Sequence, residues 1–244
     1  MPNCWQGAYW QLSHFPQESK RKVIAGIPAY NEAEHISDII RKASKYVDEV
    51  TVVDDGSTDN TAQIAKAAGA TVIRSQINQG AGQATKTCFQ VARERGADAL
   101  VTLDGDGQHD AEEISKVVAP ILEGKADLVI GSRFLGGQDN IPRYRRFGIN
   151  VVTFLLNFAS KIKVSDSQSC YRAYSRKAID ALNITEKGFA FSVQLLIQAR
   201  QRNLAITEVP ISCVYHPDSH TLNPIMHGLG VALSVIKLRL KSLC

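Results

Sequence analysis

The chain has 244 residues, with 28 Lys and Arg against 24 Asp and Glu, so its formal net charge is only +4. This length suits one large domain, and so small and mixed a charge does not by itself indicate a nucleic-acid-binding protein. The five cysteines are widely spaced without a C-x-x-C pair, which argues against a disulfide framework or a zinc site and favours the reducing cytoplasm. No apolar run reaches the roughly 18 residues of a membrane-spanning helix.

From Lys22 onward, short apolar runs alternate with segments of helical periodicity. The expected strands are 23–27 (ended by Pro28), 49–53, 70–74, 99–103 and 127–130. The expected helices are 34–46, a helix capped by Ser57 or Asp59 that runs to residue 68, 81–95 and 111–123. This alternation predicts an α/β fold with mostly parallel strands, right-handed crossovers and helices on both faces of the sheet. Ligands in such folds bind beyond the carboxyl ends of the strands.

The rhythm changes after Arg133. Helical patterns cover 144–160 and 191–202, a short strand is expected at 206–209, and a final helix at 224–240. Residues 1–21 lack the basic start and apolar run of a secretory signal. We therefore divide the chain into an N-terminal extension (1–21), one α/β domain (22–224) and a C-terminal amphipathic helix (225–244).

The most informative motif is Asp104-Gly105-Asp106-Gly107-Gln108-His109, which follows an apolar strand directly. Two carboxylates one residue apart project the same way from extended backbone, and the glycines let a ligand approach closely. This pattern is typical of a Mg²⁺ or Mn²⁺ site in which the metal keeps water and phosphate oxygens. Gln108 and His109 are candidates for a further ligand or a supporting contact. A turn in which Asp and Gly serve only the backbone is the alternative.

Two further segments follow strands at the same predicted edge of the sheet. In Asp54-Asp55-Gly56-Ser57-Thr58-Asp59, a carboxylate can accept from a nucleobase or ribose, and the hydroxyls can cap the next helix. In residues 78–84, glycines would let backbone N–H groups meet phosphate or sugar oxygens at a helix N-terminus. Thr85 stands where a dinucleotide-binding pattern has its third glycine, which disfavours a hydride-transferring dehydrogenase.

Taken together, these segments resemble the family 2 glycosyltransferases, and most closely the polyprenyl-phosphate sugar synthases typified by dolichyl-phosphate mannose synthase. Five motifs carry the resemblance in the family's order: Pro28-Ala29-Tyr30-Asn31-Glu32, the segment from Val52 to Asp59, the glycine segment 78–84, Leu103 to His109, and Ile130-Gly131-Ser132-Arg133-Phe134. The similarity covers about residues 23–224.

This resemblance implies a GT-A fold and inverting transfer of a hexose from a UDP- or GDP-sugar. It implies that Asp104, Asp106 and Gln108 hold Mg²⁺ or Mn²⁺ on the donor diphosphate, and that Asp55 binds the base or ribose. The other residues expected around the nucleotide sugar are Pro28, Ala29, Tyr30, Glu32, Gly82 and Arg133. Asp106 counts as catalytic because the bound cation would stabilise the departing diphosphate.

The acceptor side is expected in the second half of the α/β domain. Asp166-Ser167-Gln168-Ser169-Cys170-Tyr171-Arg172 resembles the family's Asp-x-x-Ser-Gly-Phe-Arg segment, which lies near the acceptor. For a hydroxyl acceptor Asp166 would be the general base, and for a phosphate acceptor it would chiefly orient; a carboxylate on a surface loop is the alternative. Candidates for binding the acceptor phosphate are Arg143, Arg146 and Arg172, because guanidinium forks suit phosphate oxygens.

Three functions follow from these residues. The first is transfer to a polyprenyl phosphate by a cytoplasmic enzyme bound peripherally to the membrane, with no nucleic acid as partner. The arginine-led helix after Pro142 and the basic C-terminal helix are candidates for lying in the lipid interface, although core packing explains their apolar stripes equally well. The second keeps the donor chemistry with a soluble or polysaccharide acceptor. The third is a catalytically silent nucleotide-sugar-binding module, which Asp104 and Asp106 oppose.

Two positions depart from the family pattern. Cys170 stands where glycine is usual, and Gln194 stands where family members often carry Glu. Gln194 keeps the silent-module hypothesis open, and both departures bear on the acceptor half rather than on the donor half.

Overall fold

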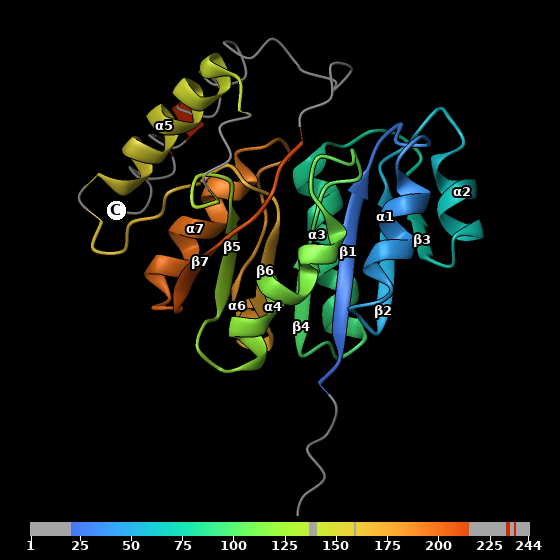
Figure 1. Ribbon diagram of the computed structural model, residues 1–244, viewed down its shortest axis with the longest axis horizontal. Coiled ribbons are helices and arrows are strands. Elements are labelled where there is room, and N and C mark those ends of the chain that lie inside the picture. Colours follow the sequence, from blue (N-terminus) through green and yellow to red (C-terminus); the bar gives the residue numbers. More distant parts are fainter. Residues whose placement is uncertain (1–20, 137–140, 159, 215–232, 235–236, 238–244) are drawn as a thin grey trace, which may run out of the picture.

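The computed structural model describes residues 21–136, 141–158, 160–214, 233, 234 and 237, and these form a layered α/β domain (Figure 1). Its sheet has seven strands in the order β3-β2-β1-β4-β6-β5-β7. The strands are β1 (Val23–Ala29), β2 (Glu49–Asp54), β3 (Thr71–Arg74), β4 (Ala99–Thr102), β5 (Leu128–Ser132), β6 (Arg172–Ser175) and β7 (Ile206–Pro210). Of these described strands, only β6 runs antiparallel to its two neighbours.

Helices cover both faces of the sheet, as expected. They are α1 (Ile36–Ala43), α2 (Thr61–Ala67), α3 (Ala81–Glu94), α4 (Ile114–Leu122) preceded by the 3₁₀ turn η1 (Ala111–Glu113), α5 (Arg143–Asn157), α6 (Arg176–Ala181) and α7 (Phe191–Gln201). Buried residues of α1, α2 and α4 pack on one face, and those of α3, α6 and α7 on the other. Because helices cover both faces of the sheet, Ile24 and Ala25, which point to opposite faces of β1, are equally inaccessible to solvent. This double burial explains why the strand is a near-continuous apolar run.

Strand β1 continues through Pro28, which the sequence analysis took as its end. Pairing with β4 stops at Gly26, whereas pairing with β2 continues to Ala29. The carbonyl of Ala29 accepts from the N–H of Asp55 beyond β2, so Pro28 faces the side where β4 has already left. Its missing N–H therefore breaks no ladder bond.

Two other expectations were wrong or incomplete. Helix α2 begins at Thr61 with Asn60 as its N-cap residue, and Ser57 instead accepts from the N–H of Asn31 at 2.9 Å. Asp59 does accept from the N–H of Thr61 at 2.9 Å, so it supports the first turn without being the cap residue. The antiparallel strand β6 and helix α6 were not expected, because four residues beginning with a buried arginine do not form a recognisable strand pattern.

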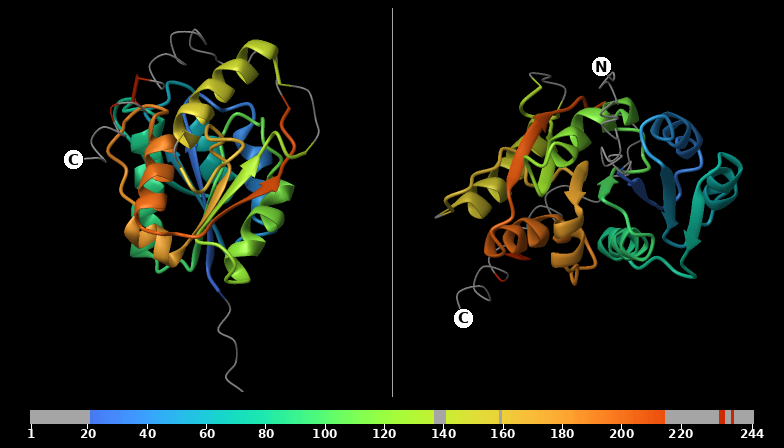
Figure 2. Two further views of the ribbon diagram at one scale, coloured as in Figure 1. Left: turned by 90° about the vertical axis from the view of Figure 1, so that its left-hand side faces the viewer. Right: turned by 90° about the horizontal axis from the view of Figure 1, so that it is seen from below.

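The carboxyl ends of β1, β2, β4 and β5 meet at one edge of the sheet, and helix α5 lies beyond that edge (Figures 1 and 2). This arrangement positions the loops that carry the motifs. Within the described residues, no helix combines the length and apolarity needed to traverse a bilayer. Of the predicted final helix at 224–240 only residues 233, 234 and 237 are described, each of them helical, and of the predicted extension 1–21 only Arg21 is described.

Candidate active site

Hydrogen bonds join the loop after β1 to the loop after β2. Asn31 adopts a left-handed backbone conformation (φ 58°), which asparagine tolerates better than most residues. Its side-chain oxygen accepts from the N–H of Thr58 at 2.8 Å, and its N–H donates to Ser57. Next to it, the N–H of Glu32 donates to the hydroxyl of Thr61 at 2.8 Å. These contacts hold residues 28–32 against β2's acidic turn.

Three carboxyl groups crowd together at the carboxyl ends of β1 and β4. A Cβ atom on Gly105 would lie 3.3 Å from the side chains of both Ala29 and Glu32, so Glu32 packs directly on the turn between Asp104 and Asp106. Burial, followed by the charges of Asp106, Asp104 and Asp59, raises the pKa of Glu32 to about 8. Burial also raises the pKa of Asp104 and of Asp106, and the charge of Asp106 adds to the shift at Asp104. Such unneutralised carboxylates favour a cation.

The donor set of this turn fits a magnesium or manganese ion. Asp106 accepts from the N–H of Gln108 at 3.0 Å and from its side-chain amide at 2.5 Å, so the turn is already shaped around its carboxylates. The described residues contain no cluster of three His, Cys, Asp or Glu side chains arranged as a metal site. Two carboxylates and the amide oxygen of Gln108 nevertheless suffice for an ion that keeps waters and substrate phosphate oxygens in its shell.

His109 lies behind this turn. Its Nε2 atom is 4.0 Å from Oδ2 of Asp104, and its ring packs against the ring of Tyr171 with a centroid separation of 5.3 Å. Burial, helped by the charge of Arg133, lowers the pKa of His109 to about 4. The imidazole is therefore neutral near pH 7, and its Nε2 atom lies beyond hydrogen-bonding distance of Asp104.

Asp55 and Gly82 make internal contacts that the sequence did not indicate. Asp55 is buried, and its carboxylate accepts from the N–H groups of Gln79 at 2.9 Å and Gly80 at 2.7 Å, so it holds the glycine segment. The N–H of Gly82 donates to the carbonyl of Lys187 at 2.7 Å, and a Cβ there would lie 2.0 Å from the carbonyl oxygen of Glu186. Gly82 is thus required by the close approach of another loop, which occupies the helix N-terminus expected to meet phosphate.

Asp166 is fully buried and forms a two-bond ion pair with Arg133, at 2.7 and 2.8 Å. It also accepts from the N–H groups of Gln168 and Ser169. Burial opposes its ionisation, but the Arg133 charge and these hydrogen bonds outweigh it and hold the pKa of Asp166 below its ordinary value. A carboxylate so stabilised is a weak base, which disfavours the general-base role considered from the sequence.

Arg172 does not face an acceptor, contrary to the expectation from the sequence. Only 1% of it is exposed, and its guanidinium donates to the carbonyls of Ser167, Ser169 and Ser192 at 2.7 to 2.8 Å. Because all of these acceptors are backbone carbonyls of neighbouring segments, Arg172 fixes the Asp166 loop against α7.

Gln194 has a similar supporting role on the other side of α7. Its side-chain oxygen accepts from the N–H of Thr185 at 2.9 Å, and its amide donates to the hydroxyl of the same residue at 2.5 Å. A glutamate could accept here but could not donate when ionised. The departure from the family pattern therefore has a structural explanation that does not involve the substrate.

The arginines at the start of α5 point in different directions. Arg143 is exposed, whereas Arg145 and Arg146 are half-buried. The guanidinium of Arg146 lies 5.9 Å from the centre of the Phe134 ring. Burial raises the pKa of Asp106, and the charges of His35 and, more weakly, of Arg145 oppose that rise. Arg145 was not among the residues expected at the site, although it lies seven residues before Val152, on the buried face of the helix.

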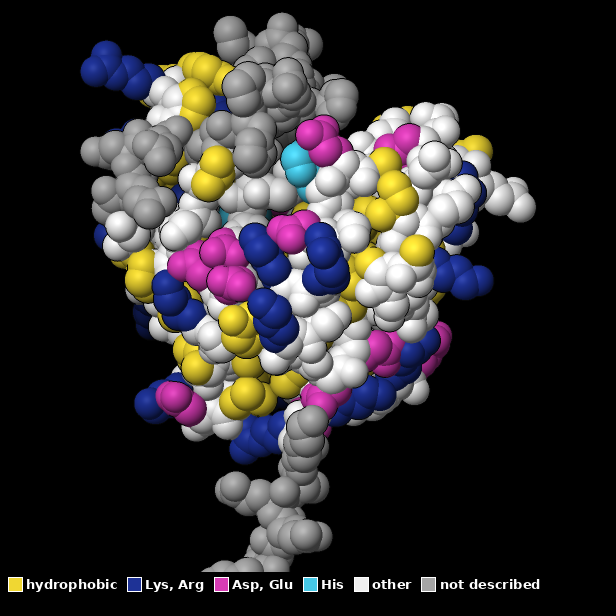
Figure 3. All heavy atoms as spheres, turned by 45° about the vertical axis from the view of Figure 1, so that its right-hand side comes forward, with side chains coloured by type: hydrophobic (Ala, Val, Ile, Leu, Met, Phe, Trp, Pro, Cys, Tyr) yellow, Lys and Arg dark blue, Asp and Glu magenta, His cyan; other side chains and the backbone are white. Residues whose placement is uncertain are grey.

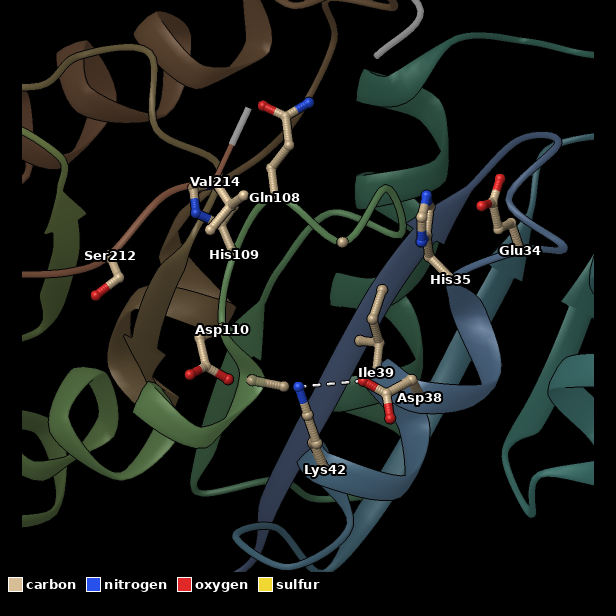
Figure 4. A pocket seen from close by; sticks show the side chains of 12 residues that line it. Glu34, His35, Asp38, Ile39, Lys42, Gln108, His109, Asp110, Ser212 and Val214 are labelled. Atoms are coloured by element: carbon tan, nitrogen blue, oxygen red, sulfur yellow. Dashed lines mark ion pairs between the residues drawn. The ribbon is translucent and has the colours of Figure 1, made fainter. Parts of the chain in front are cut away.

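A cavity of about 390 Å³ flanks the acidic turn between α1 and residues 107–111 (Figure 4). Gln108 and His109 line it, but Asp104 and Asp106 do not. On the α1 side, Lys42 forms an ion pair with Asp38 at 3.1 Å. In the space-filling view, acidic and histidine side chains meet near the upper rim of one face (Figure 3). The cavity lies beside the carboxylate cluster rather than within it.

Comparisons with known proteins agree with this geometry. The sequence profile of Glycosyl transferase family 2 matches residues 25–182. The UDP-N-acetylglucosamine–dolichyl-phosphate N-acetylglucosaminyltransferase of Methanococcus voltae is 35% identical over 214 residues, covering 78% of this chain and 84% of the relative. The polyprenol monophosphomannose synthase of Mycolicibacterium smegmatis is 30% identical over 205 residues, covering 79% and 77%.

A solved structure has the same fold. Glucosyl-3-phosphoglycerate synthase from Mycobacterium tuberculosis, crystallised with Mn²⁺, UDP-glucose and phosphoglyceric acid, superposes with a TM-score of 0.69 at 25% identity. The superposition covers 92% of this chain and 80% of that one. The fold is therefore GT-A, as the resemblance implied.

Replacing Gly82 with alanine should destabilise the protein by about 2–3 kcal/mol, because the new methyl group would overlap the carbonyl oxygen of Glu186. Gly148→Ala in α5 is the matched control. Nothing lies within 4 Å of its Cβ position, so helix propensity alone should stabilise by about 0.5–1 kcal/mol. Denaturant unfolding measures both, and equal effects of the two variants would contradict the packing role of Gly82.

The crowded carboxyls should make metal-free stability depend on pH. The folded-state pKa of Glu32 is raised from 4.5 to about 8, so its contribution is present below pH 4.5 and is lost as the pH rises towards 8. Glu32→Gln should therefore stabilise the metal-free protein at pH 8.5, by roughly 1–2 kcal/mol after allowing for solvent screening, and much less at pH 5. Thermal unfolding at the two pH values tests this; a gain independent of pH would count against charge crowding.

Proposed function

This chain belongs to glycosyl transferase family 2, and on that basis we propose that it transfers a hexose from a UDP- or GDP-sugar to a polyprenyl phosphate, with inversion at the anomeric carbon. The catalytic unit is residues 22–224, with 1–21 and 225–244 as flanking segments. It works at the cytoplasmic face of the membrane as a peripheral enzyme.

The state of Asp166 is the observation that carries the choice of acceptor. A hydroxyl acceptor needs a base to take its proton, but both oxygens of Asp166 are occupied by Arg133 and by backbone N–H groups. A phosphate monoester, with a second pKa of about 6, is already ionised at neutral pH and needs no base. The names of relatives that act on dolichyl and polyprenol phosphates support the same choice.

The reaction then requires positioning more than proton transfer. An acceptor phosphate oxygen attacks the anomeric carbon, the bond from that carbon to the donor diphosphate breaks, and the electron pair leaves with the nucleotide. Mg²⁺ or Mn²⁺ held by Asp104, Asp106 and Gln108 would supply Lewis-acid stabilisation of the departing diphosphate. We assign the incoming phosphate to Arg145, which is half-buried on the inner face of α5, and whose charge opposes the rise in the pKa of Asp106.

We assign the remaining residues around the donor on the basis of the family resemblance. Those proposed to contact the nucleotide sugar are Pro28, Ala29, Tyr30 and Glu32, at the end of β1. Arg133 orients the Asp166 loop through its ion pair and adds positive charge near Asp104. Arg143 and Arg146 have secondary roles at the entrance, because one is exposed and the other packs on Phe134.

A soluble acceptor is the second candidate. The observation that favours it is the likeness to glucosyl-3-phosphoglycerate synthase, whose crystals contain phosphoglyceric acid. The two candidates separate in an assay that offers short-chain polyprenyl phosphate and soluble phosphorylated acceptors to the same protein. Product on the soluble acceptors alone would contradict the lipid proposal.

Asp106→Asn should lower transfer at saturating Mn²⁺ by about 10²- to 10³-fold, because the leaving diphosphate loses its charge stabilisation. Chelation of divalent ions should abolish the wild-type activity, and added Mn²⁺ should restore it. Asp180→Asn, an exposed carboxylate on α6, is the control and should keep wild-type turnover. Equal turnover of the Asp106 variant and the wild type would remove the metal assignment, whereas no transfer by the wild type itself would favour the silent binding module.

Arg145→Gln should raise the KM for polyprenyl phosphate by about 10- to 100-fold, since a hydrogen bond between two charged groups is lost. The slow hydrolysis of donor without acceptor should change little. Lys66→Gln, exposed on α2 at the other end of the sheet, serves as control (Figure 1). An unchanged KM would exclude Arg145 from the acceptor site, and an equal loss of hydrolysis would move it to the donor site.

A further inference from the structure

Helix α5 carries an apolar stripe that faces solvent. Its members are exposed by 38% to 71% and are Tyr144, Phe147, Val151, Phe154 and Phe158. At 100° per residue they fall within an arc of about 80°, and along the axis they span about 21 Å. The rings of Phe154 and Phe158 contact each other, with centroids 6.4 Å apart. Isolated apolar residues on a surface are ordinary, but a continuous aromatic stripe of this length indicates a contact surface.

The opposite side of α5 attaches the helix to the domain. Its buried residues are Val152, Thr153 and Leu156, which lie roughly opposite the stripe. The hydroxyl of Thr153 shares a hydrogen bond of 2.8 Å with that of Ser167, beside Asp166. Asn157 donates to the carbonyl of Val164 at 2.7 Å and accepts from its N–H at 3.1 Å. The stripe is therefore held rigidly outward from the loop that carries Asp166.

Charge identifies the kind of surface that fits. Between residues 141 and 165 the sequence contains five cationic residues and no Asp or Glu; the cations are Arg143, Arg145, Arg146, Lys161 and Lys163. They stand at both ends of the stripe. A second copy of this face would bring like charges together without acidic partners. Residues 221–244 carry three cations and no acid, so this segment is no better matched.

We propose that the α5 stripe inserts into the headgroup region of an anionic phospholipid bilayer, with the flanking cations on lipid phosphates. Aromatic residues on one helix face with basic residues at the ends are the features of an interfacial helix. This inference rests on the proposed function in one respect, because it brings the acceptor loop to the surface that holds a polyprenyl phosphate. Arg143 then meets headgroups, and Arg145 on the inner side meets the acceptor.

Co-sedimentation with vesicles of phosphatidylcholine containing about 30% phosphatidylglycerol tests the docking surface, with pure phosphatidylcholine as comparison. The wild-type protein should sediment with the anionic vesicles, and Phe147→Ser/Phe154→Ser should lower the partition coefficient at least about tenfold. Ile77→Ser is the matched control because Ile77 is 69% exposed, similar to Phe154, but lies outside α5. Lys161→Glu/Lys163→Glu should weaken binding to the anionic vesicles, whereas Lys66→Glu should not.

A second measurement separates this inference from the proposed function. Transfer to a short-chain, water-soluble polyprenyl phosphate without vesicles should be the same for the double Phe variant and the wild type, which also shows that the variant is folded. Wild-type protein that stays in the supernatant, or a Phe variant that sediments like it, overturns the docking surface alone. A dimer abolished by the Phe substitutions, with no vesicle binding, would assign the stripe to a second copy. Absence of transfer in every variant would contradict the proposed function instead.

Discussion

The burial of three neighbouring carboxyl groups at the carboxyl ends of β1 and β4 is the constraint on which the site depends. Glu32 packs on the turn that joins Asp104 to Asp106, because a Cβ atom at Gly105 would lie only 3.3 Å from the Glu32 side chain. Their raised pKa values measure how poorly the protein alone accommodates these charges. A divalent cation, as in the proposed function, would offset these negative charges.

Arginines organise the acceptor half, and most of them do so from inside the protein. Arg172 holds three carbonyls around the Asp166 loop, and Arg133 neutralises Asp166 itself. A buried arginine without such partners would destabilise the fold. The Asp166 loop, strand β6 and the Arg133–Asp166 ion pair therefore depend on one another. Asp166 is therefore best understood as a buried carboxylate that shapes its own loop through Arg133 and backbone N–H groups.

Helix α5 connects the loop that carries Asp166 to the outside of the molecule. One of its faces bonds to the loop beside Asp166, and another presents aromatic rings to solvent. In its first turn, Arg145 lies on the inner side, Arg146 lies over the Phe134 ring, and Arg143 is exposed. A helix with these contacts fixes the distance between the Asp166 loop and any surface that binds the aromatic stripe.

The sequence by itself determined the family, the alternation of strands and helices, and the acidic turn at Asp104. These are local features, because a run of apolar residues followed by Asp-Gly-Asp defines both a strand and its loop. Helical periodicity alone also predicted that the segments of α5 and α7 are helices.

Only the tertiary structure decided how side chains far apart in sequence share their bonds. It turned Arg172 inward, gave both oxygens of Asp55 to the glycine segment, and closed the Gly82 helix terminus with the carbonyl of Lys187. It also left Arg143 exposed while half-burying Arg145 and Arg146. Each outcome depends on which partner lies within hydrogen-bonding or Coulombic reach after folding, and a linear pattern carries no such distance.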